Sequence, residues 1–79
     1  MKYIQAGKVN DIQPAQRYKH FKGGEYQVIA LAKMEADGTQ AVVYKAHDDT
    51  VWVRSVTNWQ ETVKVNGKSV PRFELIKDR

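Results

Sequence analysis

Residues 18–26, which read Tyr-Lys-His-Phe-Lys-Gly-Gly-Glu-Tyr, carry more polar and aromatic side chains than a turn between strands requires. His20 is the candidate for acid–base chemistry near neutral pH, because a free imidazole has a pKa of about 6.5. A general base needs a hydrogen-bonded partner and a substrate pocket, and no serine–aspartate pair accompanies His20 in the sequence. We therefore expect no catalytic residue and no enzyme, with His20 in a structural hydrogen bond beside Tyr18 or Tyr26.

A second group of candidate residues lies downstream, where Trp52 and Arg54 are two positions apart. Side chains alternate along a strand. If Val51 and Val53 face the core, Trp52 and Arg54 share the opposite face. Tryptophan and arginine are enriched in binding hot spots because each combines a large contact area with a polar group. The pattern therefore predicts a binding surface here.

A structural role is the alternative for this pair. Trp52 would then close one mouth of a small barrel, and Arg54 would pair with Glu61 or Glu74. If the ligand is a nucleic acid, its bases would stack on Trp52 and Arg54, and basic side chains on neighbouring strands would contact its phosphates. The candidate ligand-binding residues are therefore His20, Trp52, Arg54, Arg72, Tyr18 and Lys45.

The sequence predicts neither a metal site nor a cofactor. There is no cysteine, so thiolate ligands and thiol nucleophiles are excluded. The turn at residues 47–49, His-Asp-Asp, carries possible ligands, but such turn tips are usually only solvated. Gly23 and Gly24 lack the flanking residues of a phosphate-binding loop, and a tight turn explains both.

The element pattern is that of an all-β protein with five or six short strands. Strands are expected at about 17–21, 26–35, 39–46, 50–56, 61–65 and 69–76, and the second is expected to be bent. The spacing of Thr57 and Gln60 resembles a capping box and predicts one helical or 3₁₀ turn before the last hairpin. Asn66-Gly67 is a strong hairpin signal, and Pro71 favours an edge or a bulge. A small, partly open, SH3-like barrel has this order of parts, whereas an OB-like barrel requires a longer helix.

The chain of 79 residues is long enough for one small domain. Residues 1–16 are expected to be an N-terminal extension with room for one edge strand, and 17–79 the single β-barrel domain. No signal peptide or transmembrane run is visible, so we expect a cytoplasmic protein without a membrane partner. Exposed strand edges would allow homo-oligomers, with pairing of the extension to an edge of a neighbouring copy as one route.

The ordered motifs resemble a family of small bacterial domains of unknown function, DUF1653. They are Tyr18-Lys19-His20-Phe21-Lys22-Gly23, Tyr26-Gln27-Val28, Val42-Val43-Tyr44-Lys45-Ala46, Trp52-Val53-Arg54 and Val70-Pro71-Arg72-Phe73. The resemblance covers about residues 17–76. Ser55 stands where the family usually has proline, Trp59 where phenylalanine is common, and the 47–49 turn is shorter than usual. The resemblance implies no established activity.

Three functional hypotheses remain. The net charge of +4 is spread along the chain rather than gathered in a block. We favour a non-catalytic binding or accessory module that contacts a protein or peptide through an aromatic and basic face. The alternative is DNA or RNA binding through the same face, with affinity that falls steeply with salt. The third is small-ligand binding or catalysis centred on His20, which requires His20, Tyr18 and Arg54 to share one pocket. Trp59, Phe21, Phe73 and Leu75 are expected in the core.

Overall fold

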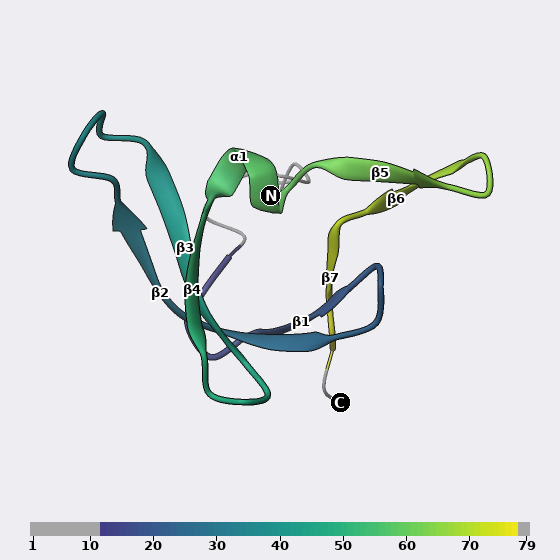
Figure 1. The fold of residues 1–79 in the computed structure, drawn as a ribbon, viewed down its shortest axis with the longest axis horizontal. Coiled ribbons are helices and arrows are strands. Elements are labelled where there is room, and N and C mark those ends of the chain that lie inside the picture. The colour runs from purple at the N-terminus through teal and green to yellow at the C-terminus, as the bar shows by residue number, and fades with distance from the viewer. Residues whose placement is uncertain (1–11, 78–79) are drawn as a thin grey trace, which may run out of the picture.

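The computed structural model describes residues 12–77 as a curved antiparallel sheet, one helical turn and a separate hairpin (Figure 1). The elements in chain order are β1 Arg17–His20, β2 Glu25–Lys33, β3 Gln40–Ala46, β4 Val51–Ser55, α1 Val56–Trp59, β5 Thr62–Val65, β6 Lys68–Pro71 and β7 Phe73–Leu75. The larger sheet has the strand order β4-β3-β2-β1-β7, and β5 pairs only with β6. The predicted all-β class is confirmed: the described fold is mostly β, compatible with a small, partly open barrel that does not close.

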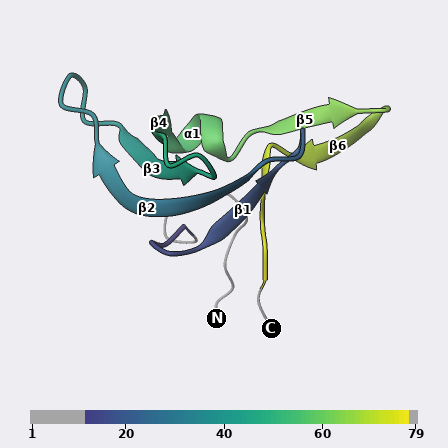
Figure 2. The same ribbon diagram turned by 60° about the horizontal axis from the view of Figure 1, so that its bottom comes forward.

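The five-stranded sheet curls because its longest strand is bent. The register between β2 and β3 shifts between Val28 and Ala30, which leaves Ile29 as an extra residue on β2. A bulge of this kind increases the local twist and bends the strand. Figure 2 shows β2 arcing beneath β3 and α1. The bend in this strand, predicted from its sequence, is therefore present, and it gives the sheet a concave face.

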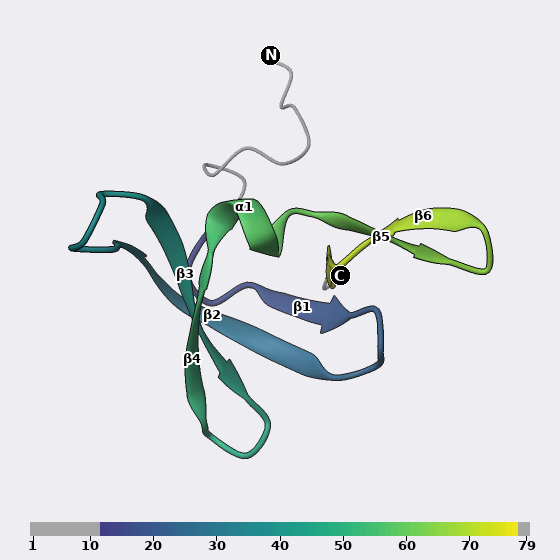
Figure 3. The same ribbon diagram turned by 45° about the horizontal axis from the view of Figure 1, so that its top comes forward.

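The C-terminal part projects from this sheet as a hairpin. Asn66 and Gly67 both have positive φ, +53° and +81°, as the two central positions of a type I′ turn require. The hairpin of β5 and β6 extends away from the larger sheet (Figures 1 and 3). Pro71 ends β6, and Arg72 separates it from β7. The run expected as one strand is thus two, which brings the total to seven.

The predicted helical turn is present as α1, but a different residue caps it. Ser55 is the N-cap, with extended φ and ψ of −61° and 149°, and its Oγ accepts a hydrogen bond from the Asn58 backbone N–H at 3.0 Å. Such a bond satisfies one of the free N–H groups at the start of a helix. Thr57, which was expected to open the capping box, lies inside the helix instead.

A small aromatic core lies between α1 and the concave face of the sheet. Its buried members are Ile12, Tyr18, Val28, Val42, Tyr44, Val56, Trp59 and Phe73. Trp59 is 2% exposed and stacks on Phe73, with ring centroids 3.8 Å apart. The predicted core positions of Trp59 and Phe73 are therefore confirmed. Phe21 and Leu75 were wrongly placed in the core, since they are 36% and 37% exposed. Phe21 follows the end of β1, and Leu75 ends the short edge strand β7.

The described part of the expected N-terminal extension contacts this domain. Ile12 is buried in the core, the Ala15 N–H donates to the Val28 carbonyl, and the Val28 N–H donates to the Gln16 carbonyl, both at 2.8 Å. Residues 1–11, where most of the extension lies, are outside the described residues. Within 12–77, no helix is long and apolar enough to cross a membrane.

Candidate functional site

Trp52 and Arg54 lie on the concave face of the sheet, above the core. In the register of β3 and β4, Trp52 lies opposite Tyr44 and Arg54 opposite Val42. Directly opposed residues share a face, and both Tyr44 and Val42 are buried. The flanking valines therefore lie on the convex face. The prediction that Val51 and Val53 face the core was wrong: they are 53% and 56% exposed. Alternation was correctly identified, but the choice of the inward face was inverted.

Arg54 is held over the core by neutral partners. Its Nε donates to the Tyr44 hydroxyl at 3.3 Å, and its Nη1 donates to the Asn58 side-chain oxygen on α1. The guanidinium carbon lies 5.2 Å from the centroid of the Phe73 ring, within cation–π range. Arg54 pairs with neither Glu61 nor Glu74, and it forms no ion pair among residues 12–77. Its charge is therefore positioned but not neutralised.

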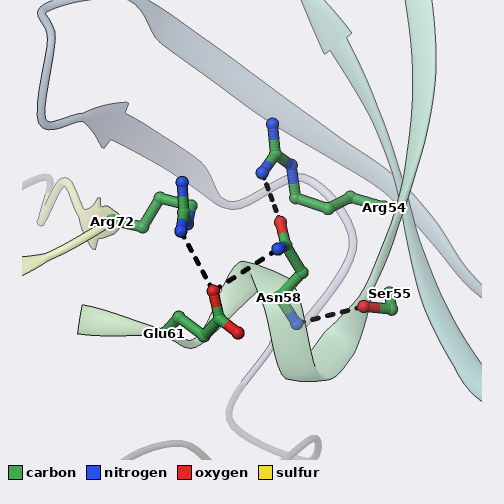
Figure 4. A network of polar contacts seen from close by, with 5 residues as sticks. All are labelled: Arg54, Ser55, Asn58, Glu61 and Arg72. Atoms are coloured by element: carbon green, nitrogen blue, oxygen red, sulfur yellow. Dashed lines mark hydrogen bonds and ion pairs between the residues drawn. The ribbon is translucent and has the colours of Figure 1, made fainter. Parts of the chain in front are cut away.

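A chain of polar contacts connects Arg54 to Arg72 (Figure 4). The Asn58 Nδ2 donates to Glu61 Oε1 at 3.4 Å, and Arg72 Nη2 donates to the same oxygen at 3.0 Å. Asn58 and Glu61 are three residues apart, a spacing that brings side chains together on a helical turn. Glu61 thus pairs directly with Arg72 and is connected to Arg54 only through the Asn58 amide, so the group keeps a net positive charge.

His20 reaches the same aromatic cluster from β1. Its ring lies edge-on to Phe73, with centroids 4.9 Å apart, and edge-on to Tyr26 at 6.3 Å. Its Nδ1 accepts a hydrogen bond from the Lys22 backbone N–H at 3.1 Å. A structural hydrogen bond beside Tyr26 fits the role expected for His20, and the donor is the backbone of the turn.

The protonation state of His20 follows from its surroundings. Partial burial lowers the pKa of His20 from its ordinary value of 6.5, and the positive charges of Arg54, Arg72 and Lys22 lower it further. Below its pKa the ring would be a third cation, but at neutral pH it stays uncharged. Because Nδ1 accepts a bond, the neutral ring carries its proton on Nε2. His20 is therefore a hydrogen-bond donor beside two arginines.

A hollow opens on the concave face next to Trp52. Its volume is about 370 Å³, and it is lined by Tyr26, Tyr44, Ala46, His47, Asp48, Trp52 and Arg54. Trp52 is 52% exposed, because β4 is an edge strand with a neighbour on one side only. Three aromatic rings and one arginine around a shallow hollow can hold a flat or extended group with an anionic end. The size is near the lower limit for small-molecule sites.

His20 lies in a different hollow, of about 230 Å³, with Lys19, Phe21, Val70, Pro71 and Glu74. Tyr18 is in neither hollow. It is buried, packs edge-on to Trp59 at 5.1 Å, and donates its hydroxyl proton to Gln16 at 3.0 Å. The pocket joining His20, Tyr18 and Arg54 that catalysis or small-ligand binding would require is therefore not formed by these hollows.

Lys45 lies away from the other candidates. It follows Tyr44 on β3, so its side chain lies on the convex face. Its ammonium forms an ion pair with Asp49 at 3.5 Å, and it lines a third hollow with Arg17, Glu25 and Gln27. Of the six candidate residues, four thus have accessible side chains on the concave side, namely His20, Trp52, Arg54 and Arg72, while Tyr18 is buried in the core on that side.

The sequence reasoning did not identify Tyr44 and Asn58 as site residues, and it named Glu61 and Tyr26 only as neighbours of Arg54 and His20. Tyr26 and Tyr44 line the hollow, and Asn58 and Glu61 link the arginines. The only sequence signal for the link was the three-residue spacing of Asn58 and Glu61. Among residues 12–77, no group of three His, Asp or Glu side chains forms a metal site. Asp48 instead accepts a bond from the Thr50 backbone N–H, which lowers the pKa of its carboxyl.

Comparison with known proteins identifies the family of the chain and a solved structure with a similar fold. The sequence model for the family described as "Protein of unknown function (DUF1653)" matches residues 16–75. The chain is also similar to a crystal structure of a DUF1653 protein from Bordetella bronchiseptica, with 27% identity and a TM-score of 0.77, covering 87% of this chain and 92% of that one. No curated protein matches. The resemblance noted from the motifs is thereby confirmed, and the chain belongs to the DUF1653 family.

Proposed function

We propose that this domain is a non-catalytic binding module whose concave face holds an acidic segment of a partner protein. The observation that carries the proposal is the position of Arg54. Its guanidinium is fixed by Tyr44 and Asn58 over the Phe73 ring, it has no carboxylate partner in the described chain, and it borders an open aromatic hollow. A pre-positioned arginine loses little freedom when it binds a carboxylate, which favours affinity.

The neighbouring groups support the same ligand chemistry. The neutral His20 ring adds an N–H donor near Arg54 and Arg72, and Trp52 adds a large exposed contact area. An aromatic ring and an arginine in one pocket are the usual anchors of a protein interface. A carboxylate flanked by an apolar or aromatic residue would use both anchors at once.

Nucleic acid fits this face less well than an acidic peptide. Phosphate binding favours several free cations along a groove. Here Arg72 is paired with Glu61, Asp48 lines the hollow, and Lys45 lies on the other face in an ion pair with Asp49. Within residues 12–77, Arg54 is the candidate cation on this face that has no ion pair, and it lies near the carboxylates of Asp48 and, as Figure 4 shows, Glu61. A single acidic side chain matches this arrangement better than a phosphate backbone does.

Binding of fluorescent probes at several salt concentrations tests the proposal. The acidic probe is a short capped peptide with valine at every second position. The positions between the valines hold threonine, tyrosine and glutamate, and tyrosine and glutamate are two positions apart. Its control carries glutamine in place of glutamate, and a labelled oligothymidylate represents nucleic acid. We expect the acidic peptide to bind at least about tenfold more tightly than its control.

The salt dependence separates the two classes of partner. A contact with one or two charges weakens only modestly between about 50 and 200 mM salt, whereas a contact with many phosphates loses several powers of ten in affinity. Tight, steeply salt-dependent binding of the oligothymidylate with no preference for the acidic peptide would overturn the proposal in favour of nucleic acid. Failure of the acidic peptide to bind would overturn it outright.

A further inference from the structure

Strand β4 forms an open edge of the five-stranded sheet (Figures 1 and 3). The Ala46 N–H donates to the Thr50 carbonyl at 2.9 Å, which fixes the alternation of hydrogen-bonded pairs along the β3–β4 ladder. Trp52 and Arg54 then direct their backbone groups toward β3. The backbone N–H and C=O groups of Val51 and Val53 point away from the sheet, where none of the described strands pairs with them.

This edge has only one of the features that usually block pairing with another chain. Protected edges are short, bulged, interrupted by proline, lined with lysine or carry a charge that points inward. The opposite edge, β7, has three residues with Glu74 at its centre. Strand β4 instead runs for five residues in unbroken register and exposes Val51, Trp52 and Val53, each by more than half. Its single charge, Arg54, reaches back to Asn58 over the core. An inward charge of this kind disfavours an apolar or basic incoming strand, whereas an incoming carboxylate would pair with it.

The open edge and the aromatic hollow belong to the same strand. Trp52 and Arg54 line the hollow from β4. A strand added beside β4 would place every second side chain on the concave face, in line with Trp52 and Arg54. The intervening side chains would lie on the convex face, beside the exposed Val51 and Val53. One extended segment can therefore bond to the edge and fill the hollow together.

We propose that an extended acidic segment of a partner protein adds to β4 as a further strand, with an apolar or aromatic side chain opposite Trp52 and a carboxylate opposite Arg54. This inference rests on the proposed function and specifies how the ligand is held. Strand addition of this kind takes its affinity from main-chain hydrogen bonds and its specificity from pockets for alternate side chains.

Charge favours an acidic partner over a second copy of this chain as the occupant. A second β4 would bring another Arg54 and another chain of net charge +4 to the same edge. Like charges on neighbouring strands destabilise pairing. An acidic segment instead supplies the counter-charge that Arg54 lacks among the described residues.

The inference is tested with two N-methylated forms of the acidic probe peptide. One form is methylated on the backbone nitrogens of its valines, and the other on those of tyrosine and glutamate. In an added strand only one of these sets points toward β4. We expect one form to lose at least about tenfold in affinity while the other stays within about threefold of the unmodified peptide. Equal binding of the two forms would overturn strand addition.

A protein variant provides the matching test. Because the Val53 N–H points away from β3, Val53→Pro removes a donor from the free edge but no bond within the described sheet. Val53→Thr is the control, since it keeps that donor and the branched side chain. We expect peptide binding to be lost in the proline variant and kept in the threonine variant, with thermal unfolding showing that both are folded. If the proline variant is unfolded, the two methylated peptides alone test strand addition.

The outcomes separate this inference from the proposed function. If the acidic peptide binds better than its glutamine control while both methylated forms bind alike, the binding module stands and strand addition fails. If no peptide binds, the proposed function fails. If sedimentation instead shows a dimer that Val53→Pro converts to a monomer, the occupant of β4 is a second copy, and the acidic-partner inference is wrong.

Discussion

The guanidinium of Arg54 lies 5.2 Å from the centroid of the Phe73 ring, although the two residues come from opposite edges of the five-stranded sheet. The curvature of the sheet brings Arg54 on one edge strand, β4, over the Phe73 ring on the other edge strand, β7. His20, opposite Phe73 in the β1–β7 register, contacts this ring as well. The candidate site is therefore a property of the curled sheet rather than of any one motif.

The two tryptophans are expected to respond very differently to truncation. Trp59→Ala removes the buried ring that stacks on Phe73, and such a change costs about 3–5 kcal/mol. In a domain this small that is a large share of the total stability. Trp52→Ala, at a half-exposed edge position, is expected to cost less than about 1 kcal/mol. Urea unfolding followed by circular dichroism measures both; similar losses would contradict the assigned core.

Ser55 offers a test of the helix cap and of the departure from the family pattern. Ser55→Ala removes the acceptor for the Asn58 N–H and is expected to cost about 1 kcal/mol. Ser55→Pro loses the same bond, but its φ of −61° already suits proline, which restricts the unfolded chain. We expect the midpoint of thermal unfolding for the proline variant to lie above that of the alanine variant. The reverse order would show that proline does not fit this backbone.

The stability of the domain should fall with pH below about 6.5 because of His20. Its pKa is lower in the folded chain, so between that lowered value and 6.5 the unfolded chain binds more protons. The His20 contribution to stability is thus greatest above 6.5 and declines as the pH falls, until His20 is protonated in the folded chain too. His20→Gln should flatten this part of the profile. Urea unfolding at several pH values from 8 to 5 measures the free energy of unfolding for both proteins. If that free energy falls as steeply with decreasing pH in the variant as in the unmodified protein, groups other than His20 cause the effect.

The fold was predictable where local chemistry determines it. The Asn66-Gly67 turn has the predicted hairpin geometry, and the strand expected at 39–46 is present as β3. The split at Arg72 was not predicted, because it depends on backbone contacts with other segments: the Arg72 N–H donates to Glu61, and its carbonyl accepts from Phe21. Local sequence does not encode such long-range bonds.

The site was predictable in part, for a similar reason. Residue type alone identified His20, Trp52, Arg54 and Arg72, which share the concave face. The inward face of β4 was misassigned, because alternation gives two equivalent faces and only the register with β3 chooses between them. Lys45 fits by residue type but lies on the convex face, with Asp49 as its partner.

A comparison of two charge-matched variants tests most directly whether the concave face is the binding surface. Arg54→Gln and Lys45→Gln each remove one positive charge, the first from the concave face and the second from the convex face. With the acidic peptide as probe, and circular dichroism as the check on folding, we expect the dissociation constant to rise at least about tenfold for Arg54→Gln and to stay within about twofold for Lys45→Gln. Equal weakening in the two variants would show that net charge alone attracts the peptide, and would contradict a site built around Arg54.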